Sequence, residues 1–168
     1  KLGFMPTFEE LENPNNRFAS EVYFADGPIM NRYFEKENRK YIEYREIPQS
    51  VIDALIATED VRFYEHEGVD KISMLRVFFK TVLLGHRSSG GGSTLSQQLA
   101  KNLYPRDEQQ VTFIPVVKLK EMFTAHRLEN IYSKDDILTL YLNTVSFGEN
   151  TFGIESAAQK YFSTSASD

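Results

Sequence analysis

The sequence predicts one mainly α-helical domain with a small β-hairpin element on its N-terminal side. Apolar residues recur at helical spacing from Pro48 onward. Before that point, the turn dipeptide Asp26-Gly27 separates two short runs of aromatic and aliphatic residues. A length of 168 residues with an apolar fraction of 41% allows one hydrophobic core, whereas two full domains would be crowded.

The region before the helices is predicted to be extended. Residues 1–18 are polar, contain prolines and asparagines, and are predicted to form a linker or an extended arm. Residues 21–25 and 28–34 flank Asp26-Gly27, which supplies the positive φ angles of a two-residue hairpin turn. Residues 39–47 alternate charged and apolar side chains, which predicts either a third short strand or a lead into the first helix.

Two helices are predicted next. The first begins at Pro48, carries one apolar face, and ends at Glu59 and Asp60. Residues 74–84 are strongly apolar and too short to span a bilayer, so they suit either an ordinary core helix or a membrane interface. Residues 88–93 consist of Ser and Gly and are predicted to be the least ordered stretch of the chain.

Capping signals predict where the later helices begin. Thr94 is expected to cap one helix, with the Gln97 side chain reaching back to complete a capping box. Ser133 and Asp136 form a second capping box, and the last helix is expected to begin near Gly153. The helix after Thr94 carries a polar stripe opposite its leucines, made of Gln97, Gln98, Lys101 and Asn102. A helix starting at Pro115 is expected to pack Leu119, Met122, Phe123 and His126.

Composition excludes several classes of function. The chain has 19 basic and 24 acidic residues, and this acidic balance argues against nucleic-acid binding driven by phosphate neutralisation. Without cysteine, disulfides, thiolate metal sites and thiol nucleophiles are excluded. No apolar run approaches the roughly 20 residues of a membrane-spanning helix, and no signal peptide is recognisable. The sequence starts at Lys1 and ends in a short polar stretch, so we expect both ends to be cuts within a longer protein.

Ionisable side chains gather at the end of the first predicted helix. Glu59 and Asp60 are followed closely by His66, and Glu59 by itself would more often be a solvated charge than a catalytic base. His66 stands between two glutamates, but no second histidine has the spacing of a zinc-binding helix. A histidine that makes structural hydrogen bonds is therefore the more economical interpretation.

The glycine run 90–92 leads into the helix capped by Thr94. A glycine turn that feeds a helix N-terminus presents free N–H groups to an anion, which suits a phosphate or a sugar. The lysine that would follow the last glycine of a nucleotide-binding P-loop is missing. A flexible loop before a well-capped helix is the alternative interpretation.

Five sequence blocks follow one another along the chain. They are Glu59-Asp-Val-Arg-Phe-Tyr-Glu-His-Glu-Gly68, Gly91-Gly-Ser-Thr-Leu-Ser-Gln-Gln-Leu-Ala-Lys-Asn102, Lys118-Leu-Lys-Glu121, Lys134-Asp-Asp-Ile-Leu-Thr-Leu-Tyr-Leu-Asn143, and Gly148 through Phe162. Together, and in this order, they resemble the peptidoglycan glycosyltransferase (transglycosylase) domain of class A bifunctional penicillin-binding proteins. The resemblance covers about residues 19–162, and the second block is the most specific.

The resemblance implies a lysozyme-like helical fold with a mobile, membrane-proximal jaw subdomain at about residues 69–112. The glycosyltransferase domain would span residues 19–168, cut short at its C-terminus, and residues 1–18 would follow a removed membrane anchor. The resemblance further implies an enzyme at the bacterial inner membrane, with its catalytic domain on the periplasmic side. Its implied partners are lipid II, the growing glycan strand, the membrane lipid surface and cell-wall synthesis proteins, and no nucleic acid.

The implied reaction joins a lipid-linked glycan to the 4-hydroxyl of the GlcNAc of lipid II, with inversion to a β-1,4 bond and release of undecaprenyl diphosphate. Glu59 matches the family's general base, and Glu121 matches its second essential carboxylate, near which Mg²⁺ or Mn²⁺ could bind; no organic cofactor is implied. Candidates for binding substrate and diphosphate are Lys101, Lys118, Arg106, Gln97, Gln98, Asn102, Ser93 and Thr94. Supporting motif residues are Asp60, Phe63, His66 and Gly68.

One position departs from the family pattern. Val117 stands where an arginine usually precedes Lys118, so one phosphate-facing cation is missing. A lytic transglycosylase or lysozyme-like enzyme is an alternative, because a lone glutamate can act there as the acid that cleaves glycan strands. A non-catalytic module that binds lipid II or peptidoglycan is a further alternative. The second block argues against cleavage, and the presence of Glu59 and Glu121 argues against a binding-only module.

Overall fold

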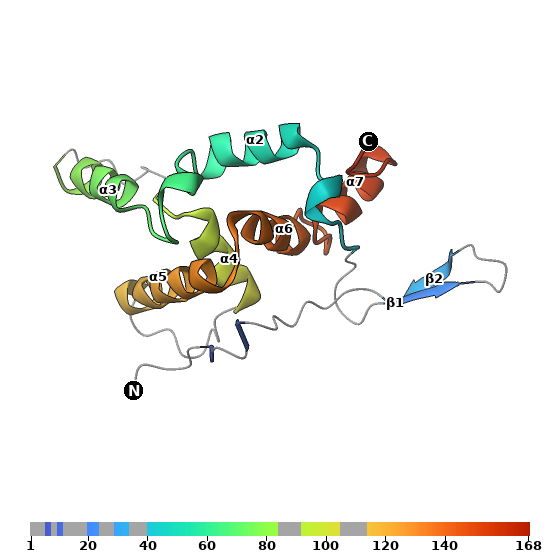
Figure 1. Ribbon diagram of the computed structural model, residues 1–168, viewed down its shortest axis with the longest axis horizontal. Coiled ribbons are helices and arrows are strands. Elements are labelled where there is room, and N and C mark those ends of the chain that lie inside the picture. Colours follow the sequence, from blue (N-terminus) through green and yellow to red (C-terminus); the bar gives the residue numbers. More distant parts are fainter. Residues whose placement is uncertain are drawn as a thin grey trace.

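The structure is a computed structural model that describes residues 6–7, 10–11, 20–23, 29–33, 40–83, 92–104 and 114–168. It is mainly helical (Figure 1). The elements in chain order are β1 (Ser20–Tyr23), β2 (Ile29–Tyr33), η1 (Tyr44–Glu46), α2 (Gln49–Glu59), η2 (Phe63–Glu65), α3 (Lys71–Leu83), α4 (Leu95–Leu103), α5 (Ile114–Ile131), α6 (Lys134–Thr144) and α7 (Ile154–Phe162).

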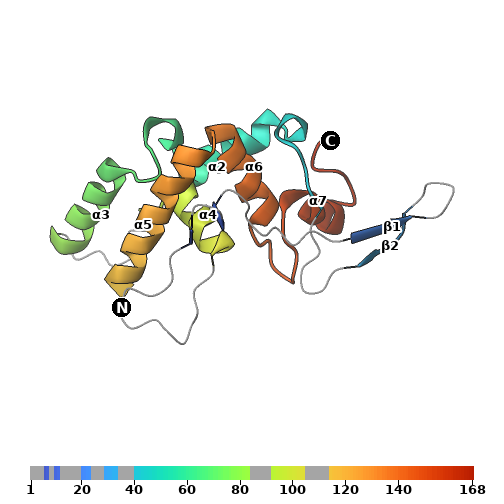
Figure 2. The same ribbon diagram turned by 60° about the horizontal axis from the view of Figure 1, so that its bottom comes forward.

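β1 and β2 form a two-stranded antiparallel sheet. Ser20 pairs with Tyr33, and the register shifts between Val22 and Tyr23. The sheet projects from the end of the molecule opposite to α3 (Figures 1 and 2). The predicted turn at Asp26-Gly27 lies outside the described residues.

Residues 40–47, the described part of the segment between the sheet and α2, form no strand. Ile42 and Ile47 are buried, and η1 lies between them. The backbone of Ile42 is held by the buried Asn143 side chain of α6, whose Oδ1 accepts from Ile42 N at 2.9 Å and whose Nδ2 donates to Ile42 O at 2.9 Å. Because both backbone groups of Ile42 bond a side chain of α6, they are not available to a neighbouring strand.

The predicted helix starts are confirmed. Pro48 is the N-cap of α2, and Gly153, with φ +80°, is the N-cap of α7. Thr94 Oγ1 accepts the N–H of Gln97 at the start of α4, and Ser133 forms the predicted capping box with Asp136 at the start of α6. These caps satisfy N–H groups that the first turn of a helix leaves without an intrahelical partner.

The predicted role of the Gln97 side chain is wrong. Gln97 is 1% exposed, and neither its amide oxygen nor its amide nitrogen has a hydrogen-bond partner among the described residues. It therefore completes no capping box with Thr94 and takes no part in an exposed polar stripe. The cause is tertiary, because α4 lies against both α5 and α6 (Figures 1 and 2), which cover more of its circumference than the leucine face alone.

The core lies where α4 meets α5 and α6, and the predicted inward face of α5 is wrong. Leu119 is 51% exposed and Phe123 is 62% exposed, whereas Ala125 and Leu128 are fully buried. An ideal Cβ on Gly68 would lie 2.7 Å from the carbonyl carbon of Ala125, so the loop before α3 packs directly on the α5 backbone there. The glycine at this contact permits that approach.

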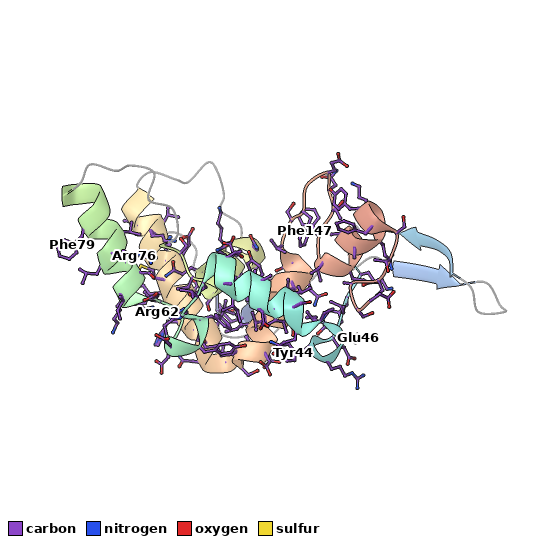
Figure 3. All side chains as sticks on the ribbon, turned by 90° about the horizontal axis from the view of Figure 1, so that it is seen from above. Tyr44, Glu46, Arg62, Arg76, Phe79 and Phe147 are labelled. Atoms are coloured by element: carbon purple, nitrogen blue, oxygen red, sulfur yellow. The ribbon has the colours of Figure 1, made fainter. Side chains whose placement is uncertain are left out.

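α3 extends from the helical body as an arm. Its apolar side chains Ile72, Leu75 and Phe79 are all exposed, which contradicts the interpretation as an ordinary core helix. Figure 3 shows Arg76 and Phe79 along this arm, with Arg62 near its base. In the part of the chain that the structure describes, no helix has the length and apolarity to cross a membrane. The stretch 88–93, which was predicted to be the least ordered, lies mostly outside the described residues. Only Gly92 and Ser93 of this stretch are described.

Candidate active site

The end of α2 is attached to the start of α4 through a buried carboxylate. Asp60 is the C-cap of α2 and is 7% exposed. Its carboxylate accepts the backbone N–H of Leu95 at 3.0 Å and lies 3.0 Å from Nε2 of His66. His66 therefore makes the structural hydrogen bond favoured by the sequence. Because Glu59 directly precedes Asp60, these bonds fix the position of the Glu59 backbone relative to α4.

A second bond joins the loop after α2 to the same helix end. The hydroxyl of Thr94 donates to the carbonyl oxygen of Gly68 at 2.6 Å. Gly68 has φ +86°, a conformation that residues with a side chain rarely adopt. Asp60 and Thr94 thus hold the two ends of the loop 60–68 against the N-terminus of α4.

The Glu59 side chain is exposed to solvent and is held by an amide. Its Oε2 accepts from Nε2 of Gln98 on α4 at 2.9 Å. The amide oxygen of Gln98 accepts in turn from the hydroxyl of Tyr141 on α6 at 3.0 Å. The Glu59 carboxylate is therefore oriented by a neighbouring donor and accessible to a substrate hydroxyl, as a general base has to be.

Glu121 and Lys118 form a second group one turn apart on α5. Nζ of Lys118 lies 3.1 Å from Oε2 of Glu121 and donates to the Ser93 hydroxyl at 2.7 Å. The Glu121 side chain is 11% exposed, so its carboxylate is largely withdrawn from water. The pair connects α5 to the turn that precedes α4 and places a cation beside it.

A cavity of about 210 Å³ adjoins Glu59. The C-terminal end of α2, the first part of α3 and the turn before α4 line it, with Glu59 on its wall together with Arg76, Ser93 and Thr94. Ser93 also accepts from Lys118, whereas Lys118 and Glu121 themselves do not line the cavity. The arrangement places a carboxylate and the Arg76 cation on one cavity wall, with Lys118 behind Ser93.

A family comparison decides the relationship. The family model described as "Transglycosylase" matches residues 26–168. The chain belongs to the transglycosylase family. The matched residues include every element from α2 to α7 and therefore the whole of the cavity described above.

Relatives in several bacteria agree with this membership. The chain is 39% identical over 158 residues to penicillin-binding protein 1A of Escherichia coli (strain K12), covering 94% of this chain and 18% of that protein. It is 37% identical over 164 residues to penicillin-binding protein 1A of Vibrio cholerae, covering 98% of this chain and 19% of that protein. It is 43% identical over 132 residues to penicillin-binding protein 1F of Bacillus subtilis (strain 168), covering 79% of this chain and 18% of that protein. The chain spans about a fifth of the length of these relatives.

The structure brings only part of the predicted site of this transglycosylase chain together. Ser93, Thr94 and Glu59 line the cavity, whereas Lys101 and Asn102 are exposed towards the C-terminal end of α4 and do not line it. Asp60 also lines the cavity, whereas Lys118 and Glu121 lie behind Ser93 and do not line it. Of the other predicted residues, Gln97 is buried without a polar partner, Gln98 holds Glu59, Phe63 is buried, and Arg106 lies outside the described residues.

Sequence reasoning missed a cation of this site. Arg76 of α3 lines the cavity, although residues 74–84 were assigned only to a core helix or a membrane interface. The signal was present, because Arg76 is one of two charged residues, with Lys80, in an otherwise apolar segment. Val117, at the position that usually carries arginine in the family, is half-buried on α5. Arg76 thus supplies a positive charge beside the cavity from a different helix.

A buried ionic network under the loop 60–68 was also missed. Nζ of Lys134 donates to the carbonyl oxygen of His66 at 2.6 Å and to Glu129 at 2.8 Å, and it lies 4.3 Å from the ring centroid of Phe63. Glu129 also accepts from the Ser96 hydroxyl at 2.5 Å. Lys134 and Glu129 therefore connect α6 and α5 to the loop and to α4. Neither the helical period nor a cap distinguishes these two residues from ordinary surface charges.

Asp70 anchors the base of α3. Its Oδ1 accepts from the backbone N–H groups of Ile72 and Ser73 at 3.0 and 3.1 Å, and its Oδ2 accepts from Nε of Arg62 at 3.1 Å. Burial would raise the pKa of Asp70, but hydrogen bonds from Arg62 and Ser73 outweigh burial and hold that pKa well below its usual range. The Arg62–Asp70 pair therefore fixes the start of α3 relative to the loop 60–68.

Glu121 is the carboxylate near which a divalent cation was expected. Among the residues that the structure describes, no group of three or more His, Cys, Asp or Glu side chains could hold a metal ion. Glu121 also pairs with the Lys118 ammonium at 3.1 Å. Mg²⁺ usually keeps several waters and binds one or two carboxylates together with substrate phosphates, so Glu121 would form only part of such a site.

Proposed function

We propose that this chain is the peptidoglycan glycosyltransferase module of a class A penicillin-binding protein and polymerises lipid II into β-1,4-linked glycan strands. The observation that carries the proposal is the position of Glu59. It lies on the wall of the cavity, its carboxylate accepts from the Gln98 amide at 2.9 Å, and Ser93 of the same cavity bonds Lys118 at 2.7 Å. A base and a cation around one opening suit a transfer that releases a diphosphate.

In the proposed reaction, Glu59 takes the proton from the 4-hydroxyl of the GlcNAc of the acceptor. The hydroxyl oxygen attacks the anomeric carbon of the donor from the face opposite to its α-linked diphosphate. The bond between that carbon and the diphosphate oxygen breaks, the new bond is β-1,4, and undecaprenyl diphosphate leaves with the electron pair. A positioned general base typically contributes roughly 10²–10⁴-fold to such a step.

The departing diphosphate needs positive charge near the start of α4. Lys118 beside Ser93 and Arg76 on the cavity wall are the groups that would receive it. The Leu95 N–H at the start of α4 already donates to Asp60. Glu121 would orient Lys118 through their 3.1 Å contact. A divalent cation near Glu121 would have to take its other ligands from the diphosphate itself, and no step above requires that ion.

We further propose that residues 69–112 form the membrane-proximal jaw and that the chain works at the periplasmic face of the inner membrane with cell-wall synthesis proteins. The exposed apolar side chains Ile72, Leu75 and Phe79 on α3 support this, because their spacing places them along one side of the helix. Figure 3 shows Phe79 on this arm. The lipid tails of both substrates would then lie on the side of the cavity that α3 borders.

Glycan cleavage is the alternative reaction for this site. A hydrolytic glutamate of the lysozyme type donates a proton to the leaving oxygen. The N–H that Glu59 accepts from Gln98 occupies one carboxyl oxygen and suits either protonation state. The reaction products therefore have to distinguish the two reactions.

The test is polymerisation of labelled lipid II in detergent by the protein, by Glu59→Gln and by Glu65→Gln. Glu65 is an exposed glutamate of the same loop and serves as the matched control. We expect glycan strands from the parent and from Glu65→Gln, and none from Glu59→Gln. Strands from Glu59→Gln would refute the assignment of the base. Shortening of preformed strands would indicate a lytic enzyme, and bound lipid II without any product would indicate a binding module.

A further inference from the structure

Three helices meet in one chain of hydrogen bonds that ends at Glu59. Tyr141 of α6 donates through its hydroxyl to Oε1 of Gln98 on α4 at 3.0 Å, and Nε2 of Gln98 donates to Glu59 at the end of α2 at 2.9 Å. Tyr141 is 5% exposed, so its hydroxyl has little access to water. The sequence placed Tyr141 only within the fourth block of the family resemblance and gave it no role of its own.

The donor and acceptor types determine the direction of this chain. An ionised carboxylate only accepts hydrogen bonds, so the NH₂ end of the Gln98 amide must face Glu59. Its oxygen then faces Tyr141, whose hydroxyl must donate. Burial raises the pKa of Tyr141, and the negative charge of Glu59 raises it further, so the hydroxyl keeps the proton that it donates.

Gln98 without the Tyr141 hydroxyl would be held only by its contact with the exposed Glu59 side chain. Its amide oxygen would have lost its donor, and the side chain would move to find another donor or water. The position of the Gln98 N–H, and with it the direction of the Glu59 carboxylate, would then be less firmly fixed.

We propose that Tyr141 is a positioning residue, which holds the Gln98 amide so that its N–H keeps the Glu59 carboxylate directed at the acceptor hydroxyl. The inference rests on the proposed function, because it assigns Tyr141 to the same proton transfer. Tyr141 touches neither substrate nor the reacting atoms in this scheme. Its contribution is expected in the chemical step and not in substrate binding.

The test compares Tyr141→Phe with Tyr132→Phe in steady-state polymerisation of lipid II. Tyr132 is the matched control, because its hydroxyl also donates to an oxygen, that of Leu11 at 2.8 Å, and it lies outside the cavity. We expect Tyr141→Phe to lower kcat about tenfold, which is the order of one hydrogen bond, with KM unchanged within about twofold. We expect Tyr132→Phe to leave kcat unchanged. Thermal unfolding of each variant checks that both remain folded.

A double-mutant cycle separates positioning from a general structural effect. If Tyr141 acts through Gln98, adding Tyr141→Phe to Gln98→Ala should lower kcat by less than about twofold more. An unchanged kcat in Tyr141→Phe, a rise in KM alone, or an undiminished tenfold loss in the Gln98→Ala background would each overturn the inference. An inactive parent protein overturns the proposed function and this inference together, whereas an active parent with an equally active Tyr141→Phe overturns this inference alone.

Discussion

Replacement of Gly68 by alanine tests whether the loop 60–68 owes its position to contact with the α5 backbone. Gly68 has φ +86°, and an added Cβ would lie 2.7 Å from the carbonyl carbon and 2.8 Å from the carbonyl oxygen of Ala125. These are main-chain atoms of a helix, so they cannot rotate away as a side chain would. Either the loop or α5 must move.

The magnitude has two parts. A left-handed backbone costs a residue with a side chain about 1–2 kcal/mol. Forcing an extra carbon against backbone atoms well inside the usual 3.5–4.0 Å contact distance costs about 1–3 kcal/mol more, as in overpacked cores. We therefore expect Gly68→Ala to lower the free energy of unfolding by about 2–5 kcal/mol. Loosening of the 2.6 Å bond from Thr94 to the Gly68 carbonyl should also reduce polymerisation activity.

Gly148→Ala is the matched control. Gly148 has φ +89°, nearly the same as Gly68, but an added Cβ there would meet only the Tyr161 hydroxyl, at 4.0 Å. Gly148→Ala should lower the free energy of unfolding only by the cost of the left-handed backbone, about 1–2 kcal/mol. Urea unfolding of both variants, with equal m-values, gives the two losses directly. Equal losses would refute the argument that close approach to Ala125 sets the position of the loop.

Two further changes test the ionic contacts around the loop. Glu129→Gln should lower the free energy of unfolding by about 2–4 kcal/mol, because it leaves the largely buried Lys134 without its carboxylate. In urea unfolding, adding Lys134→Met should restore part of that loss. A greater loss in the double variant would contradict this reasoning. Asp70→Asn should reduce stability most at neutral pH. Burial opposes the ionised form, but the hydrogen bond from Arg62 outweighs it and depresses the folded-state pKa of Asp70, so its contribution is present above about pH 4 and is lost as the pH falls further. The stability gap between the parent protein and this variant should narrow in urea unfolding below about pH 4, and a gap independent of pH would count against the ion pair.

Local signals were sufficient for most of the secondary structure. The caps at Thr94, Ser133 and Gly153 depend on side chains and backbone angles within one turn, so the sequence alone places these helix starts correctly. The same holds for the end of α2 at Glu59. The failures concern orientation. Gln97 and Gln98 are adjacent in sequence but about 100° apart around the helix, so one is buried and the other reaches Glu59.

The sequence by itself determined the family blocks, the order of the helices and the two carboxylates of the candidate site. Only the tertiary structure decided what holds them. Tyr141 meets Gln98 across 43 residues, and Lys134 meets the carbonyl of His66 across 68 residues. Such contacts depend on how helices dock, and docking is set by close packing of many side chains at once. A periodic pattern reports which residues share a face, but it contains no information on which distant donor that face will meet.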